Sequence, residues 1–141
     1  MRGHSLIELL FVMTLMGVAV TALAPAARRQ RDRAQVVGAR EAVVALLAEA
    51  RTAAMERGSA TVHVATDPAF AEGRAAGVPL RRVALADEFG VTVTLGGAAS
   101  DADLSYDALG IGRLASQTIT FRRGHSSSEL VVSGYGRVRR Q

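Results

Sequence analysis

Residues 1–27 read MRGHSLIELLFVMTLMGVAVTALAPAA, and this stretch decides how the rest of the chain can be organised. Glu8 is the only charged residue between Ser5 and Ala27, so the 19 residues that follow it are uncharged. As an α-helix, these residues span about 28 Å, close to the hydrocarbon thickness of about 30 Å in a bilayer. A carboxylate at the start of such a run is costly in lipid, and it predicts a functional site at Glu8.

Three interpretations of this N-terminus compete. A secretory signal peptide has a basic start, a short apolar stretch and a small-x-small cleavage site, which Ala22-Leu23-Ala24 imitates. Glu8 in the apolar stretch and Pro25 directly after the cut both count against a signal peptide. A plain membrane anchor fits the length but leaves Glu8 unexplained. In the third interpretation, Gly3-His4 is a processing junction, and residues 5–8 open a helix that stays attached.

The apolar run leads into an amphipathic helix. Residues 28–33 are polar, and beyond them apolar residues recur at three- and four-residue steps, with charged residues opposite. Gly58 is a typical residue for the C-terminal end of a helix. The sequence therefore predicts one helix over about residues 5–57, roughly 80 Å long, whose first half needs lipid or other subunits. The apolar stripe expected to pack on the chain's own domain is Val36, Ala39, Val43, Leu46, Leu47, Ala50 and Ala54.

Beyond Gly58 the apolar period changes from helical to alternating, which predicts strands. Runs rich in glycine, proline or polar residues predict the connections between them. This spacing is typical of a small antiparallel sandwich, with the helix covering one face, so the predicted fold class is α+β. The expected strands are 60–66, 80–85, 91–95, 104–106, 117–121 and 130–133, with loops at 67–79 and 96–103 and a turn at 124–128.

The charges of the chain are unevenly distributed. The net charge of +4 divides into +3 for residues 28–57, −4 for residues 58–112 and +5 for residues 113–141. Such asymmetry indicates a polyanion-binding end or two complementary protein surfaces. The absence of cysteine excludes disulfides, thiol nucleophiles and zinc–thiolate sites.

Few residues suit catalysis or metal binding. His125 precedes three serines in a turn, which is ordinary turn composition rather than evidence for a nucleophile. Asp101 and Asp103 would hold a hard cation only weakly, and a solvated loop is the preferred interpretation. The sequence therefore predicts no catalytic residue, metal or cofactor, and the chain is expected not to be an enzyme. A membrane-anchored periplasmic enzyme is kept as a low-ranked alternative, behind the two structural functions described below.

Residues 3–10, GHSLIELL, resemble the class III signal of type IV pilins and type II secretion pseudopilins. The resemblance implies that a prepilin peptidase cuts after Gly3 and methylates the new amino terminus at His4, where the family usually has phenylalanine or methionine. Glu8 is then the fifth mature residue, which in this family pairs with the amino terminus of a neighbouring subunit and sets the register of assembly. Pro25 falls where these helices often carry a kinking proline.

The C-terminal part resembles the GspH/FimT group of minor pilins. The stretches LSYDALG at 104–110 and VVSGYGRVR at 131–139 are similar to the "FdplG" and closing "vsptGRvr" stretches of that group. The resemblance implies a pilin-like helix packed on a β-sandwich. It divides the chain into a prepilin leader (1–3), a transmembrane and assembly helix (4–27), its amphipathic continuation (28–57) and a β-rich globular domain (58–141).

This resemblance implies a structural subunit, anchored once in the inner membrane, with its globular domain in the periplasm. The leading hypothesis is a minor pseudopilin of a type II secretion system, assembled at the pseudopilus tip for protein secretion. The implied partners are the prepilin peptidase, other minor and major pilins or pseudopilins, the inner-membrane assembly platform, and membrane lipid around the N-terminal helix.

The alternative is a type IV pilus minor pilin that binds DNA for uptake in natural transformation. FimT-type relatives are linked to DNA uptake through a GRxR stretch, which residues 136–139 match. Guanidinium groups also suit phosphate, and a cluster of them gives salt-sensitive binding without sequence preference. A solvated strand end and docking on an acidic partner subunit remain open. The candidate DNA-binding residues are Arg122, Arg123, Arg137, Arg139 and Arg140.

Overall fold

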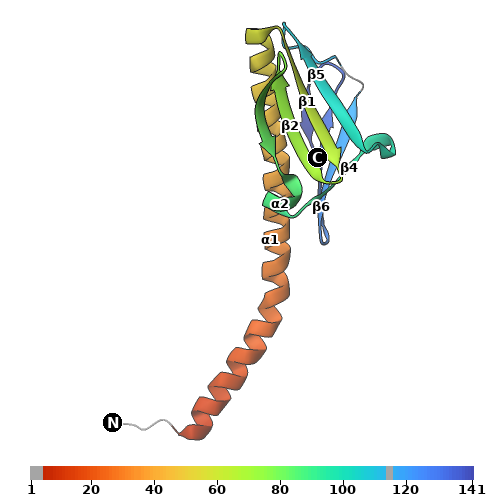
Figure 1. Cartoon of the computed structure of the whole chain (residues 1–141). Helices are drawn as coiled ribbons and strands as arrows, with labels where there is room; N and C mark the ends of the chain where they lie inside the picture. The colour runs from red at the N-terminus through yellow and green to blue at the C-terminus, as the bar shows by residue number, and fades with distance from the viewer. Residues whose placement is uncertain (1–4, 114–115) are drawn as a thin grey trace.

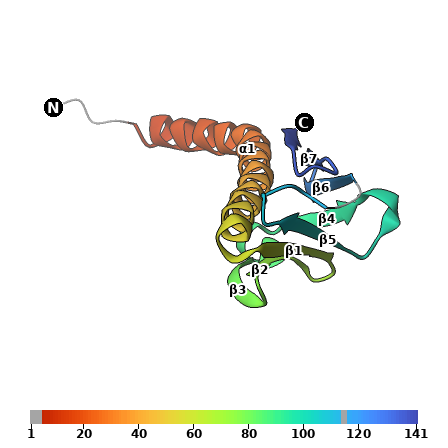
Figure 2. The ribbon, with the colours of Figure 1, turned by 90° about the horizontal axis from the view of Figure 1, so that it is seen from above.

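The computed structural model describes residues 5–113 and 116–141 of the chain. A single long helix, α1 (Leu6–Arg57), carries two four-stranded antiparallel sheets along its second half (Figure 1). The predicted α+β class is confirmed, and the arrangement is consistent with a pilin-like fold. The first half of α1 extends away from the sheets on its own (Figures 1 and 2).

Helix α1 begins and ends where the sequence predicts. Ser5 is the N-cap, with its side chain accepting a hydrogen bond from the backbone N–H of Ile7. Gly58 is the C-cap, and its N–H donates to the carbonyl of Ala54 at 2.8 Å. Pro25 lies inside the helix, where its missing N–H removes one backbone hydrogen bond. The N-terminal part of α1 runs at an angle to the part that carries the sheets (Figure 2).

Each sheet combines strands from neighbouring parts of the chain. The first sheet has the order β3-β2-β1-β5, and the second has the order β4-β6-β7-β8. A short helix, α2 (Leu85–Phe89), and a 3-10 turn, η1 (Gly96–Ala98), flank β4. The strands are β1 (Ser59–Thr66), β2 (Ala69–Ala75), β3 (Val78–Val83), β4 (Thr92–Leu95), β5 (Asp101–Asp107), β6 (Gln117–Arg123), β7 (Ser126–Val132) and β8 (Val138–Arg140).

The prediction of a loop over residues 67–79 is wrong, because β2 and the start of β3 occupy it. The inward positions of β2 hold only alanine and glycine, so the alternation carries little apolar signal. These residues are small because α1 passes close above them. A Cβ on Gly73 would lie 2.9 Å from Cδ1 of Leu46, so a larger residue there would displace this buried leucine.

Other parts of the β-rich region also differ from the prediction. Strand β5 starts at Asp101 and β7 at Ser126, because both strands continue into polar residues that pair with a neighbouring strand. The 96–103 loop and the 124–128 turn are correspondingly shorter. Residue 85 begins α2 rather than ending a strand, and β8 was not predicted at all. These strand ends are set by backbone pairing, which leaves no apolar pattern in the sequence.

The core lies between α1 and the inner faces of the two sheets. Every residue of the predicted helix stripe is buried, and Leu46 and Val43 are completely shielded from solvent. Burying one such leucine contributes about 1.5–3 kcal/mol. The second half of α1 is therefore part of the globular domain, whereas no described side chain before Val36 belongs to this core.

A tight contact at the end of the sheets positions the C-terminal arginines. The N–H of Gly112 donates to the carbonyl of Tyr135 at 3.2 Å. Gly136 has a φ of 79°, and a Cβ there would lie 2.7 Å from Cε1 of Tyr106. Only glycine fits this turn, which directs Arg137 into the approach to β8.

Candidate assembly helix and arginine surface

The first half of α1 has an apolar surface on all sides. Eleven large apolar side chains between Leu6 and Val20 are each more than half exposed. Among the described residues, α1 is the one helix long and apolar enough to cross a membrane. A surface of this kind requires lipid or other apolar helices around it.

The few polar groups in this half are arranged as lipid requires. The hydroxyl of Thr14 donates to the carbonyl of Leu10, and that of Thr21 donates to the carbonyl of Val18 at 2.9 Å. Such bonds satisfy the hydroxyl within the helix itself. The apolar half of α1 is therefore compatible with the hydrocarbon layer over its whole length, apart from Glu8 at its start.

Glu8 lies in the first turn of α1 and is exposed. A carboxylate at this position is favoured by the partial positive charge of the helix N-terminus. Gly3 and His4, the predicted processing and methylation residues, lie outside the described residues.

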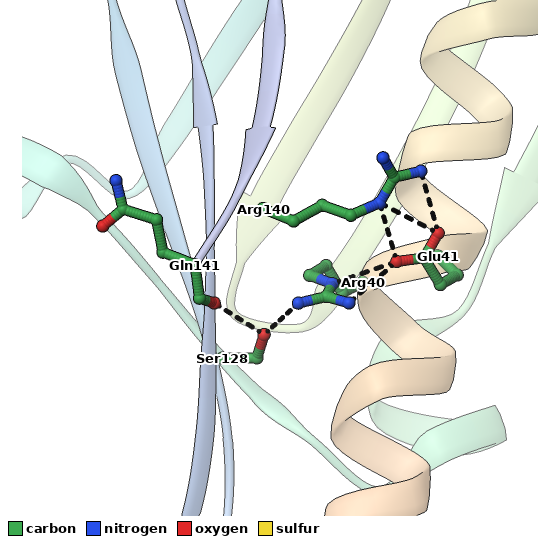
Figure 3. Close-up of polar contacts among 5 residues, drawn as sticks. All are labelled: Arg40, Glu41, Ser128, Arg140 and Gln141. Atoms are coloured by element: carbon green, nitrogen blue, oxygen red, sulfur yellow. Dashed lines mark hydrogen bonds and ion pairs between the residues drawn. The ribbon is translucent and has the colours of Figure 1, made fainter.

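The structure separates the five candidate arginines. Arg140 forms a two-pronged ion pair with Glu41 of α1, with Nε to Oε1 at 3.0 Å and Nη2 to Oε2 at 3.1 Å (Figure 3). Arg40 binds the same carboxylate at 2.9 Å and also donates to the hydroxyl of Ser128. Ser128 in turn donates to the backbone carbonyl of Gln141. This network, which we call the C-terminal clamp, ties β8 to α1.

The clamp changes the ionisation of its members. The hydrogen bond from Arg140 lowers the pKa of Glu41 below its usual value of 4.5, against a smaller opposing effect of desolvation, and Arg40 lowers it further. The same pair raises the pKa of Arg140. The charged form of Glu41 is therefore the form that the fold favours.

We expect the clamp to contribute stability at neutral pH that is lost in acid. A carboxylate with a depressed pKa in the folded state stabilises the fold above its unfolded pKa, and this contribution disappears as the pH falls through the folded pKa. Because the Glu41 side chain is 43% exposed, solvent screening limits it to on the order of 0.5 kcal/mol. Glu41→Gln is expected to lower the Tm by a few degrees at neutral pH, measured by circular dichroism. The matched control is Glu56→Gln, at an exposed position on the same helix. A Tm difference that persists unchanged below the folded pKa of Glu41 would contradict this role.

Arg123 is also engaged with the helices. Its Nε donates to Oδ1 of Asp32 on α1 at 3.0 Å, and its Nη1 donates to the carbonyl of Phe89 at the end of α2. Arg123 therefore joins the β6–β7 hairpin to both helices. This contact holds the β6–β7 hairpin beside α1. In Figure 1 the hairpin extends further toward the apolar first half of α1 than the other strands do.

Arg137 and Arg139 are the two candidates that the structure brings together on an exposed surface. They line a groove with Ser133 and with Tyr135, whose side chain is 83% exposed. Arg122 lies on the same outer face of the second sheet but pairs with Ser127, whereas Arg139 pairs with Val131. Four residues along a strand correspond to about 14 Å, so Arg122 does not join this groove.

A row of charged residues across the first sheet was not found from the sequence. Arg82, Glu72, His63 and Asp103 lie directly opposite one another on its outer face. Nδ1 of His63 is 2.8 Å from Oδ1 of Asp103, and the guanidinium of Arg82 lies 4.1 Å from the centre of the Phe70 ring. The alternation in β1 places His63 on the outer face, but only the strand register shows what it faces. Within residues 5–113 and 116–141, no group of three or more potential ligands could hold a metal ion.

In comparisons with known proteins, the chain matches no family model, no curated protein and no solved structure. The function must therefore be inferred from the residues and the geometry described above.

Proposed function

We propose that this chain is a minor pseudopilin of a type II secretion system, a structural subunit that is stored in the inner membrane and assembled at the pseudopilus tip. The observation that carries the proposal is the division of α1. Its second half packs one apolar face against the globular domain, and its first half is an exposed apolar rod with Glu8 in the first turn. Such a rod suits both storage in lipid and packing among other helices.

In this proposal the prepilin peptidase cuts after Gly3 and methylates His4, which becomes the mature amino terminus. Exchange of lipid for other helices changes the apolar environment of α1 little, because lipid tails are as apolar as leucine side chains. Packing and electrostatics must therefore direct assembly. A pair between Glu8 and the amino terminus of a neighbouring subunit supplies a specific term, which is strong because the dielectric constant is low there.

The globular domain then presents a fixed surface to the other minor and major pseudopilins. The C-terminal clamp and the Arg123 contacts hold the second sheet on α1, and the apolar core packs both sheets against the helix, so the domain follows the helix as one body when the assembly platform moves it. The proposal is tested by the N-terminus of the mature chain, which must be His4.

A type IV pilus minor pilin that binds DNA is the second candidate, and the exposed groove at Arg137 and Arg139 favours it. Among the described residues, neither guanidinium lies within ion-pair distance of a carboxylate. Tyr135 beside them offers an exposed ring on which a base can stack. Arg123 and Arg140 are bound to α1 and Arg122 lies outside the groove, so Arg137 and Arg139 are the candidates that form this surface.

The DNA candidate predicts that Arg137→Ala combined with Arg139→Ala strongly weakens binding of duplex DNA by the full chain in detergent. Loss of two phosphate contacts should also reduce the slope of log affinity against log salt by about 1.8. Fluorescence anisotropy with a labelled duplex measures both quantities. The matched control is Arg81→Ala with Arg82→Ala, two exposed arginines on the other sheet. If the unmodified chain binds no DNA at low salt, the DNA candidate is excluded and the pseudopilin proposal stands alone.

A further inference from the structure

We propose that the end of the globular domain nearest the apolar half of α1 binds the headgroups of anionic phospholipids. The proposed headgroup surface has two parts: a collar of four exposed arginines on α1 and the tip of the β6–β7 hairpin. The inference rests on the proposed function only in requiring that the first half of α1 spans a membrane. The collar is Arg28, Arg29, Arg31 and Arg33, and the tip comprises Arg122 and residues 124–127.

The collar lies at the level of the headgroups. The uncharged run ends at Ala27, and the collar begins with the next residue. At about 1.5 Å per residue, its members lie about 2–9 Å beyond the end of that run. Each headgroup layer of a bilayer is roughly 5–7 Å thick. A helix whose apolar run fills the hydrocarbon layer therefore places these guanidinium groups among the lipid phosphates.

The hairpin tip is held at the same level by direct contacts. The ion pair between Arg123 and Asp32 fixes the end of β6 beside α1 at 3.0 Å. An ideal Cβ at Gly124 would lie 2.9 Å from Oδ2 of Asp32, so the turn itself touches this carboxylate. Asp32 is five residues beyond Ala27, or about 7–8 Å along the helix axis. The tip therefore faces the outer edge of the headgroup layer.

The charges at this end of the domain are mostly positive. Asp32 is the only acid between residues 28 and 40, and Arg123 neutralises it on the side of the domain. Arg28 and Arg29 lie one turn closer to the membrane on the same face of the helix, beneath the hairpin. Helix α2 adds Asp87 and Glu88 to this end of the domain. Six arginines against these three acids still leave an excess of three positive charges.

The chemistry of the tip suits a phosphate. Arg122, Gly124, His125, Ser126 and Ser127 line a polar depression that offers a guanidinium and two hydroxyl groups. Guanidinium binds phosphate oxygens in bidentate geometry, and hydroxyl groups can donate to the remaining ones. The depression has no large apolar side chain that would enter the hydrocarbon layer. The tip therefore rests on the headgroups, and the occupant that its charge fits is an anionic phospholipid such as phosphatidylglycerol.

This surface gives the stored subunit a defined orientation. The helix alone anchors the chain but leaves the domain free to tilt relative to the membrane. Each arginine near an anionic surface contributes about fivefold to its binding. With the hairpin on the headgroups, the second sheet is held at one inclination to the membrane, and extraction into a filament must break these contacts.

The test measures the depth of the hairpin tip in the full chain. The chain has no cysteine, so Ser127→Cys gives a single attachment site for a spin label. The label is compared in nanodiscs of phosphatidylcholine and of phosphatidylcholine mixed with phosphatidylglycerol. Its collision rate with a water-soluble nickel chelate is expected to fall severalfold in the mixed lipid. Arg28→Gln with Arg29→Gln should remove this fall, whereas Arg137→Gln with Arg139→Gln, on the far part of the second sheet, should preserve it.

A second label at Met16→Cys reports insertion of the helix and separates the possible failures. If the Met16 label is shielded and the Ser127 label is equally accessible in both lipids, the headgroup inference is wrong and the proposed function is unaffected. If the Met16 label is accessible to nickel, the helix does not span the bilayer and both are wrong. If the pair of variants at Arg137 and Arg139 has the same effect as the collar pair, the response reflects overall charge, which also overturns the inference.

Discussion

Replacing Glu8 with alanine is expected to leave the chain in the membrane but to reduce its incorporation into filaments about tenfold or more. Removal of one partner from a charge pair in a low-dielectric contact costs about 2–5 kcal/mol, and each 1.4 kcal/mol corresponds to a factor of ten. The apolar side chains from Leu6 to Val20 are untouched by this change, so insertion into lipid is preserved. The variant is therefore expected to be defective in assembly, where Glu8 contacts another subunit, and not in insertion into lipid.

The measurement compares the chain in membranes with the chain in sheared filaments, by quantitative immunoblotting of both fractions. Glu8→Gln removes the charge with little change in shape and is expected to behave like Glu8→Ala. Glu56→Gln removes an exposed glutamate from the other end of α1 and is expected to assemble normally. Normal assembly of Glu8→Gln would show that the carboxylate is not the assembly group.

The sequence was sufficient to predict α1 because several local signals agree there. Ser5 and Gly58 cap its two ends, and the apolar stripe from Val36 to Ala54 keeps one helical face over about five turns. Each of these signals acts between residues that are close in the chain. The helix boundaries therefore follow from local chemistry, and the structure confirms them.

The β-rich part could be predicted only where apolar residues alternate. Strand β1, with Val62 and Val64 inward, was found, whereas β2 was missed because its inward residues are alanine and glycine. The missing information is the proximity of α1, which makes small residues necessary under Leu46. Strand β8 exists because it pairs with β7, and such pairing depends on the tertiary fold.

The candidate arginines show the same limit. The sequence predicts a basic C-terminal end, but it cannot show that Arg140 is directed at Glu41, 99 residues earlier in the chain. It likewise cannot show that Arg123 joins Asp32 across 91 residues. Side-chain direction follows from strand register, and register depends on long-range pairing. The structure thus divides one predicted cluster into a clamp, a hairpin contact and an exposed groove.

The second large effect is expected at the N-terminal junction. Gly3→Val should block the peptidase, because the resemblance implies that the glycine defines the cleavage position. The uncut chain keeps residues 1–3 in front of His4, so no new amino terminus forms to pair with the carboxylate of a neighbouring subunit. The variant is expected to accumulate in the membrane at its full length and to be absent from filaments. Cleavage of the variant at the normal position would contradict this role of Gly3.

The most direct test of the proposed function is the intact mass of the native chain, purified from membranes of its own host. We predict a chain that begins at His4, three residues shorter than the translated sequence, with one methyl group on its amino terminus. A chain that still begins with Met1 would contradict processing by a prepilin peptidase. A chain that begins at Pro25 would identify the apolar stretch as a secretory signal peptide and would overturn the pseudopilin proposal.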